Sequence, residues 1–277
     1  MVTVVEEVGS VVAENVGEIL ETAQGVPAAP HAEIWHALVE GGWGAVTADP
    51  DNGVEPREIL EIARVTGRFP YSTPLVSTLL AARWGDRHEQ DLAAGVVIAL
   101  ERGDQVVAPY YSPGARVVTS DGDVSLVEPL TVGTFSLVAP VAILPASTHP
   151  VHGVQAQEAS AAYAAVGVGC ADAVLSRAID WVQTREQFGR PLKDFQAVRH
   201  HLADAHIARE QAWTAAIAAV HEPEAAARWA RQSFALARTV IEIGIQVHGG
   251  VGFTWEVGLH HFLDQVVELD SILGAAR

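Results

Sequence analysis

The residues most able to bind a ligand lie in a short break between two long runs of helical periodicity. Arg185, Gln187 and Phe188 lie in this break, and Gln196 stands where the next run begins. A guanidinium at a helix end presents planar donors that match two oxygens of a pyrophosphate, and the Gln187 amide can both donate and accept. This combination favours a phosphate-bearing ligand. The alternative is that Arg185 only caps a helix C-terminus while Phe188 is a buried aromatic residue of the turn.

A second candidate binding segment carries Gln246, Gly249 and Gly250. Two glycines after a helix most often form a C-cap and a turn. Glycines also let backbone amides approach a ligand closely, and Gln246 lies one turn before them. We interpret the segment as part of the same ligand site, and His248 within it as a structural hydrogen-bonding residue.

Adjacent histidines could suggest a metal site. The pairs are His200-His201 and His260-His261. Two metal ligands on one helix face are usually three or four residues apart, so this spacing predicts no metal. A single cysteine, Cys170, provides no disulfide framework.

The two glutamine-containing segments together resemble the acyl-CoA dehydrogenase family. The run Arg-Glu-Gln-Phe-Gly from Arg185 is similar to the family's Arg-x-Gln/Thr-Phe-Gly element, and Gln-Val-His-Gly-Gly from Gln246 to its Gln-x-x-Gly-Gly loop. In the family both elements grip the FAD of a neighbouring subunit, so the resemblance implies FAD as the cofactor. The cofactor-binding residues that it implies are Arg185, Gln187, Phe188, Gln196, Gln246, Gly249 and Gly250.

The catalytic base of the family has no clear counterpart. The family's reaction removes the proton α to a thioester and passes a hydride from the β carbon to the flavin, so a carboxylate must reach that proton. Leu273 stands in the register of the usual Glu, and Asp264-Gln265 in that of the family's Arg-Asp pair. Another branch has its base near the start of the helix before Arg185, where Glu158 lies one residue out of register. A Glu at a helix start ordinarily favours the helix dipole, so we predict no catalytic residue, with Glu158 as the remaining candidate.

The pattern resembles the small, non-catalytic subunit of a two-subunit acyl-CoA dehydrogenase from actinobacteria. Such a subunit keeps the arms that hold a shared FAD and lacks the ring pocket and the base. The resemblance implies α,β-desaturation of an acyl-CoA thioester, with a steroid side-chain CoA ester as one candidate substrate. It also implies a base-bearing partner subunit in an α2β2 assembly and a flavoprotein electron acceptor.

Two other hypotheses stay open. The chain could be a self-sufficient acyl-CoA or acyl-ACP dehydrogenase that uses Glu158 as its base. Alternatively, it could be a flavin-free scaffold that only stabilises a partner enzyme. The flavin content of the chain with and without its partner separates these hypotheses.

Composition limits the partners and the compartment. The formal charge is −17 and the pI is near 5.0, which argues against binding to the phosphate backbone of nucleic acid. No uninterrupted apolar run approaches the ~20 residues of a membrane span. The first residues are acidic where a secretory or mitochondrial leader needs basic ones. We therefore expect a cytoplasmic protein with no membrane partner.

The predicted fold class is mainly α and acyl-CoA dehydrogenase-like. It has an N-terminal helical domain over residues 1–92, a shortened middle β region over 93–152 and a C-terminal four-helix bundle over 153–277. Apolar spacing with Gly or Pro boundaries predicts N-terminal helices over 8–24, 32–40, 56–66 and 75–84. Short β-branched runs predict strands over 96–100, 116–119, 124–127 and 136–144. The bundle helices are predicted from Glu158, with clear periodicity over 163–185, from Phe195 onward, from Pro223 to the Gly249 break, and over 259–273.

Two details of this plan bear on packing and on the flavin. Gly167 and Gly169 lie inside the first bundle helix, where each costs about 1 kcal/mol relative to Ala, which indicates close packing against a neighbouring helix. In the family a longer middle domain supplies the wall behind the flavin ring. Its opening Ala-Leu-Thr-Glu-Pro motif is matched here only by the five residues from Ile98 to Arg102, without the Thr. We therefore expect the ring end of the cofactor to rest elsewhere.

Overall fold

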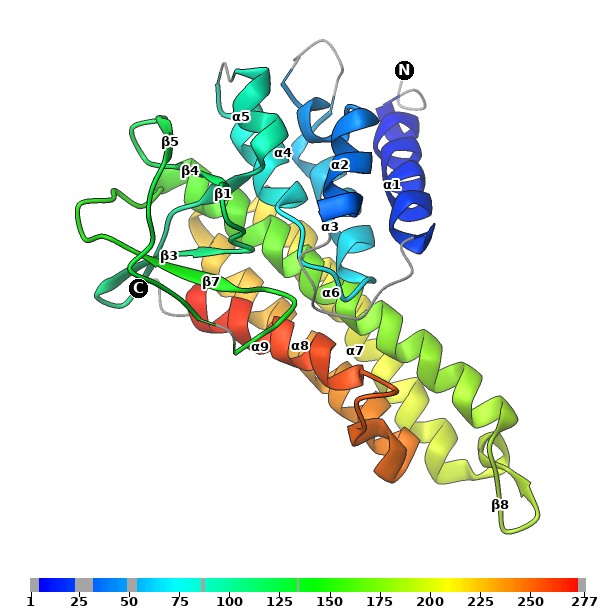
Figure 1. The fold of residues 1–277 in the computed structure, drawn as a ribbon. Helices are drawn as coiled ribbons and strands as arrows, with labels where there is room; N and C mark the ends of the chain where they lie inside the picture. Colours follow the sequence, from blue (N-terminus) through cyan, green and yellow to red (C-terminus); the bar gives the residue numbers. More distant parts are fainter. Residues whose placement is uncertain (1–4, 23–31, 49–53, 86–87, 134, 274–277) are drawn as a thin grey trace.

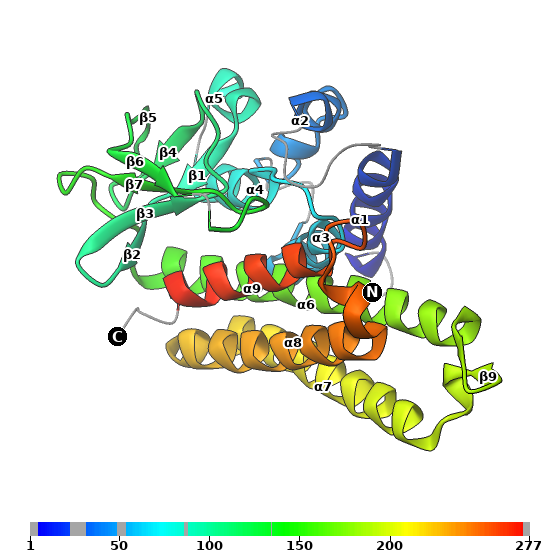
Figure 2. The same ribbon diagram turned by 60° about the horizontal axis from the view of Figure 1, so that its bottom comes forward.

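A computed structural model describes residues 5–22, 32–48, 54–85, 88–133 and 135–273 (Figure 1). Helices form the first and last parts of the chain and short strands lie between them, which confirms the mainly α fold class. The strands pack near one end of a long helical bundle, and a small hairpin extends from the other end (Figures 1 and 2). The division into three domains remains a prediction, because one hydrophobic core joins residues of all three parts.

The N-terminal part of the described chain consists mainly of α-helices. They are α1 (Val5–Thr22), α2 (Ala32–Glu40), α3 (Pro56–Gly67), α4 (Leu75–Arg83) and α5 (Glu89–Ala94). The first four agree closely with the predicted ranges, although residues 23–24 of the first prediction lie outside the described residues. The sequence analysis missed α5, because six residues are too few for a periodic pattern.

One fully buried side chain from each of the first four helices meets in a shared core. These residues are Val16, Leu38, Ile62 and Leu79, all with no exposed surface. Complete burial of an aliphatic side chain stabilises a fold by about 1.5–3 kcal/mol. The N-terminal helices therefore share an apolar core of their own, separate from their contacts with the bundle.

The middle of the chain forms two small sheets. The first contains β1 (Val96–Ile98), β4 (Arg116–Val118) and β5 (Val124–Leu126), with β1 parallel to β4 and β4 antiparallel to β5. The second is antiparallel and has the order β2-β3-β7-β6. Its strands are β2 (Leu100–Arg102), β3 (Gln105–Pro109), β6 (Thr131–Gly133) and β7 (Val141–Leu144).

Three strand predictions need correction. The single strand expected over 96–100 is divided at Ala99, which joins β4 through its N–H and Val151 through its C=O. The strand expected over 136–144 begins only at Val141, because Ser136 Oγ accepts from the N–H of Ala139 and closes a local turn. β3 and β6 were not predicted: β6 has only three residues, and β3 ends at Pro109, a residue typical of turns and strand ends.

Four long helices form the C-terminal bundle. They are α6 (Gly153–Thr184), α7 (Gln196–His221), α8 (Ala226–His248) and α9 (Leu259–Leu273), and neighbours along the chain run in opposite directions (Figure 2). α9 has its predicted bounds. α6 begins at Gly153 and not at the expected Glu158, while a short 3₁₀ turn over Pro223–Ala225 precedes α8.

The helix α6 lies at the centre of the fold. Among the described residues it alone is long and apolar enough to cross a membrane, and 89% of its most apolar window is buried inside the protein. Burial of that kind is typical of the core helix of a globular protein.

The backbones of α3 and α6 approach each other closely where the two helices cross. A Cβ atom at Gly169 would lie 1.9 Å from the carbonyl oxygen of Arg64, and one at Gly67 would lie 2.0 Å from that of Val166. Only glycine permits two backbones to approach this closely. A Cβ at Gly167 would lie 3.0 Å from the ring of Phe234 on α8. The close packing predicted from Gly167 and Gly169 is therefore confirmed.

The close crossing of α3 and α6 predicts that one methyl group added at Gly169 strongly lowers the stability of the fold. We expect Gly169→Ala to lower the free energy of unfolding by about 3 kcal/mol, because the clash is with backbone atoms that cannot rotate away. Gly17→Ala in α1 is the matched control, since its Cβ would meet only a side-chain atom of Val65 at 3.4 Å. The control should be neutral or stabilising by up to about 1 kcal/mol. Urea unfolding measures both, and equal stabilities of the two variants would contradict the assigned contact.

Candidate functional site

The segment after α6 forms a two-stranded hairpin that extends from the bundle. Its strands are β8 (Glu186–Gln187) and β9 (Arg190–Pro191), and Gln187 pairs with Arg190. The turn residues Phe188 and Gly189 have φ values of +55° and +77°, as a type I′ hairpin turn requires. Figure 2 shows this hairpin standing beyond the ends of α6 and α7.

The turn holds its aromatic residue out into solvent. Phe188 is 94% exposed and has a positive φ, which is uncommon for a bulky residue and costs about 1–3 kcal/mol. The alternative hypothesis of a buried turn aromatic is therefore wrong. Phe188 contacts Phe195 edge to face at 6.2 Å, and the Arg190 Cζ lies 4.0 Å from the Phe195 ring centroid. Strain in an exposed aromatic residue indicates a role beyond folding.

Arg185 lies at the C-cap of α6, above a stack of two rings. Its Cζ is 5.7 Å from the ring centroid of Trp181, which stacks on His248 with centroids 5.3 Å apart and an interplanar angle of 18°. His248 Nδ1 donates to the carbonyl oxygen of Gly244 (2.7 Å), so the expected structural hydrogen bond is confirmed. The stack fastens the end of α6 to the end of α8 and places the two glutamine-containing segments at the same end of the bundle.

Trp181 also leaves a donor without a partner. Its indole Nε1 is buried and has no hydrogen-bond acceptor among the described residues. Leaving such a group unpaired costs about 1–3 kcal/mol, a cost that this end of the bundle bears beneath its surface. Sequence analysis did not single out Trp181, although its position one turn before Arg185 was a usable signal.

The segment after α8 has an open backbone. Gly249 ends α8 with φ +68° and its N–H donates to Gln246, so the C-cap role is real. Nothing lies within 4 Å of a Cβ position at Gly249 or Gly250, and both glycines and Gln246 are exposed. Gly249 can therefore cap α8 and still leave its backbone accessible to a ligand. The short 3₁₀ helix η5 (Gly249–Phe253) and the residues after it expose three large apolar side chains, Val251, Phe253 and Trp255.

Gln187 and Gln196 are the remaining predicted cofactor-binding residues in and after the hairpin. Gln196 is the first residue of α7 and is exposed. The Gln187 side chain is also exposed, and its Nε2 donates to the carbonyl oxygen of Glu186 (2.8 Å), which leaves its Oε1 available. Both amides are therefore at the surface, one in the hairpin and one at the start of α7.

Glu158 lies on α6, but it is held inside the chain. Its side chain is 18% exposed, Trp84 Nε1 donates to Oε2 (2.6 Å), and Arg83 Nε lies 3.6 Å from Oε1. The adjoining cavity has a volume of ≈10 Å³, about the space of one water molecule. In this arrangement the carboxylate ties α4 to α6.

Gln265 stands at one of the two positions that correspond to the family's Arg-Asp pair, and it belongs to a buried polar network. Gln265 Nε2 donates to Tyr110 Oη (2.8 Å), and Gln265 Oε1 accepts from Cys170 Sγ (3.2 Å). Burial raises the pKa of the Cys170 thiol, which keeps it protonated and able to donate. Burial raises the pKa of Asp264 as well. Leu273 is buried, so these positions serve packing within the described chain.

Potential metal ligands do not cluster in the described part of the chain. Among the residues that the structure describes, no group of three His, Cys, Asp or Glu side chains is placed to hold a metal ion. His260 and His261 have ring centroids 4.1 Å apart and pack against Trp255.

Comparison with known proteins identifies the family. Residues 155–274 match the family model for the acyl-CoA dehydrogenase C-terminal domain. Acyl-CoA dehydrogenase IpdE2 of Mycobacterium tuberculosis is 29% identical over 304 residues, which cover 98% of this chain and 92% of that protein. Residues 155–274 therefore carry the family's C-terminal domain, and nearly the whole chain is similar to an acyl-CoA dehydrogenase.

Solved structures show the same fold. Butyryl-CoA dehydrogenase from Megasphaera elsdenii has a TM-score of 0.73 at 14% identity, covering 96% of this chain and 94% of that one. A variant of the Tcur3481-Tcur3483 steroid ACAD has a TM-score of 0.70 at 22% identity, covering 98% and 94%. The ChsE4-ChsE5 complex from Mycobacterium tuberculosis has a TM-score of 0.63 at 19% identity, covering 100% and 94%.

The contacts of Glu158 predict a structural effect. Glu158→Gln should lower the free energy of unfolding by about 2 kcal/mol, because Arg83 loses a half-buried charged partner. The surface trio of Glu222, Trp229 and Arg228 has the same residue types, with the Glu222 side chain 56% exposed. Glu222→Gln should therefore change stability by less than about 0.5 kcal/mol. Urea unfolding compares the two variants, and equal effects would contradict the assignment.

Proposed function

We propose that this chain is a subunit of an FAD-dependent acyl-CoA dehydrogenase and contributes FAD-binding arms to a site shared with a base-bearing partner subunit. The observation that carries the proposal is the Trp181–His248 stack. It brings the exposed hairpin of Arg185 and the open backbone of Gly249 to one end of the bundle, where no described residue accepts from the buried indole N–H of Trp181.

The residues present fit the phosphate and adenosine half of FAD. Arg185, whose Cζ lies over the Trp181 ring, can donate two hydrogen bonds to pyrophosphate oxygens. The exposed ring of Phe188 offers a face for stacking, and the backbone at Gly249 and Gly250 is open to a close approach. The amides of Gln187, Gln196 and Gln246 provide further donors and acceptors. When bound, FAD supplies a hydride acceptor for the oxidation of the acyl thioester.

The proposal assigns proton removal to the partner subunit. The thioester's α proton needs an accessible carboxylate. In this chain Leu273 occupies the usual register, Gln265 bonds within the core, and Glu158 is bound by Arg83 and Trp84. These contacts support a non-catalytic role for this chain.

Structural neighbours support a heteromeric assembly. Two of them are named as the Tcur3481-Tcur3483 steroid ACAD and the ChsE4-ChsE5 complex. On that basis we propose an α2β2 complex acting on an acyl-CoA, with a steroid side-chain CoA ester as the candidate substrate, a flavoprotein as electron acceptor and the cytoplasm as compartment. The exposed apolar side chains of Phe188, Val251, Phe253 and Trp255 give the partner a surface to cover at this end.

FAD content tests the shared site. The chain should be purified alone and together with a base-bearing acyl-CoA dehydrogenase subunit from the same organism, and flavin absorbance and acyl-CoA oxidation measured for each. We expect both only in the complex. Arg185→Ala should weaken FAD binding about tenfold or more, because a charge-assisted contact to phosphate is lost. Arg228→Ala is the matched control, since Arg228 also lies over a tryptophan ring, that of Trp229, but away from the hairpin.

Two results would contradict the proposal. Stoichiometric flavin and turnover in the lone chain would show a self-sufficient enzyme and make Glu158→Gln the next variant for turnover. Full FAD content and activity of the partner without this chain would instead indicate a flavin-free scaffold.

A further inference from the structure

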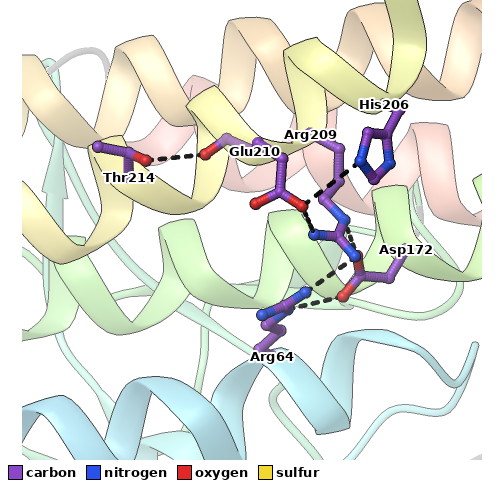
Figure 3. A network of polar contacts seen from close by, with 6 residues as sticks. All are labelled: Arg64, Asp172, His206, Arg209, Glu210 and Thr214. Carbon is purple, nitrogen blue, oxygen red and sulfur yellow. Dashed lines mark hydrogen bonds and ion pairs between the residues drawn. The ribbon is translucent and has the colours of Figure 1, made fainter. Parts of the chain in front are cut away.

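A separate polar groove lies between α3, α6 and α7. Arg64 and Arg68 line it from α3 and its C-cap, Asp172 from α6, and His206 and Arg209 from α7. Figure 3 shows Arg64 and Arg209 converging on Asp172 from opposite sides. The groove has a volume of ≈360 Å³, which is within the range of small-molecule sites and leaves room for more than a single inorganic ion.

The charge of this groove is opposite to that of the chain. The whole sequence has 17 Lys and Arg against 34 Asp and Glu. The lining of the groove has three arginines and a single carboxylate, that of Asp172. A concave surface lined by one sign of charge concentrates the field and attracts ligands of the opposite sign. An anion is therefore the ligand class that this surface favours.

Internal contacts fix two of the arginines in place. The Asp172 side chain is 12% exposed and lies 2.7 Å from both Arg64 Nε and Arg209 Nε. Arg64 also stacks over the ring of Trp213, with 4.7 Å from Cζ to the centroid, and Arg209 pairs with Glu210. These contacts give the guanidinium groups fixed directions without a ligand, which lowers the entropy cost of binding.

These contacts give no structural role to the Arg68 side chain. The ion pairs of Asp172 with Arg64 and Arg209 tie three helices together, so a structural role accounts for both residues. The Arg68 guanidinium makes no hydrogen bond or ion pair with any described residue, yet it lines the same groove as two other guanidinium groups. Asp172, the carboxylate of the lining, is already paired with the other two arginines, so the charge of Arg68 is left to attract an anion from outside the chain.

We propose that the groove binds a phosphate-bearing small molecule, with Arg68 and Arg64 on its phosphate. Ser176 in the groove wall supplies a hydroxyl donor, and Leu175 and Ile179 form an aliphatic wall for the organic part of the ligand. Arg guanidinium groups match phosphate oxygens in geometry as well as charge. The site is distinct from the hairpin that carries Arg185, because its residues come from the side of α6 that faces α3.

Calorimetric titration of the full chain tests this site with two probes, inorganic pyrophosphate and ADP, at low ionic strength. We expect both to bind, with ADP tighter if the aliphatic wall holds its organic part. Arg68→Ala should weaken both about tenfold, the effect of one charge-assisted contact. Arg57→Ala is the matched control, because Arg57 is exposed on the same helix and does not line the groove. An unchanged thermal melt of Arg68→Ala would show that its fold is intact.

Three results would overturn the proposal. They are no binding of either probe, equal losses in the Arg57 and Arg68 variants, and loss of pyrophosphate binding in Arg185→Ala. The last result would place the anion at the hairpin. Conversely, the proposed groove predicts that Arg68→Ala keeps the FAD content of the complex, so this site and the flavin site can fail independently.

Discussion

The approach of α3 to α6 at Gly67 and Gly169 is the constraint on which the rest of the structure depends. The two backbones meet so closely that a single methyl group on either glycine would overlap a carbonyl oxygen. This crossing holds the N-terminal helices against the bundle. It also brings Arg64 within reach of Asp172, so that an ion pair and the groove around it form beside the packed glycines.

Polar groups inside the described chain are mostly committed to other residues of the chain. Gln265 joins Tyr110 to Cys170, and Glu158 joins the end of α4 to α6. Glu268 on α9 pairs with Arg102 on β2 at 3.1 Å, although burial raises the pKa of its carboxyl group. A buried group that is fully bonded specifies packing and is costly to redirect toward a substrate. The interior therefore supports assembly more than chemistry.

The end of the bundle that carries the hairpin differs from the interior. There the hairpin exposes Phe188 at a strained backbone angle, the backbone after α8 is open, and Trp181 keeps an unpaired N–H. A protein tolerates such features where something outside the chain contributes to the free energy. The contrast between buried carboxylates that are paired inside the chain and an exposed, strained end agrees with a chain that completes its site with another molecule.

Much of the fold followed from local patterns. The bounds of α2 and α9 were predictable because Gly, Pro and apolar spacing act within a few residues of where they stand. The start of α6 at Gly153 was not, since the residues from Gly153 to Gln157 are too few for a periodic apolar pattern. Strand pairing was equally beyond prediction, because the division at Ala99 depends on partners distant in the sequence.

For the site, the sequence alone determined the residue types. Arg185, Gln187 and the glycines at 249 and 250 carry the family pattern in their order and spacing, and their chemistry does not depend on the fold. Only the tertiary structure decided which of them meet. The stacking of Trp181 on His248 and the convergence of two arginines on Asp172 join residues from different helices. Contacts of this kind arise from helix packing, which no local pattern of residues encodes.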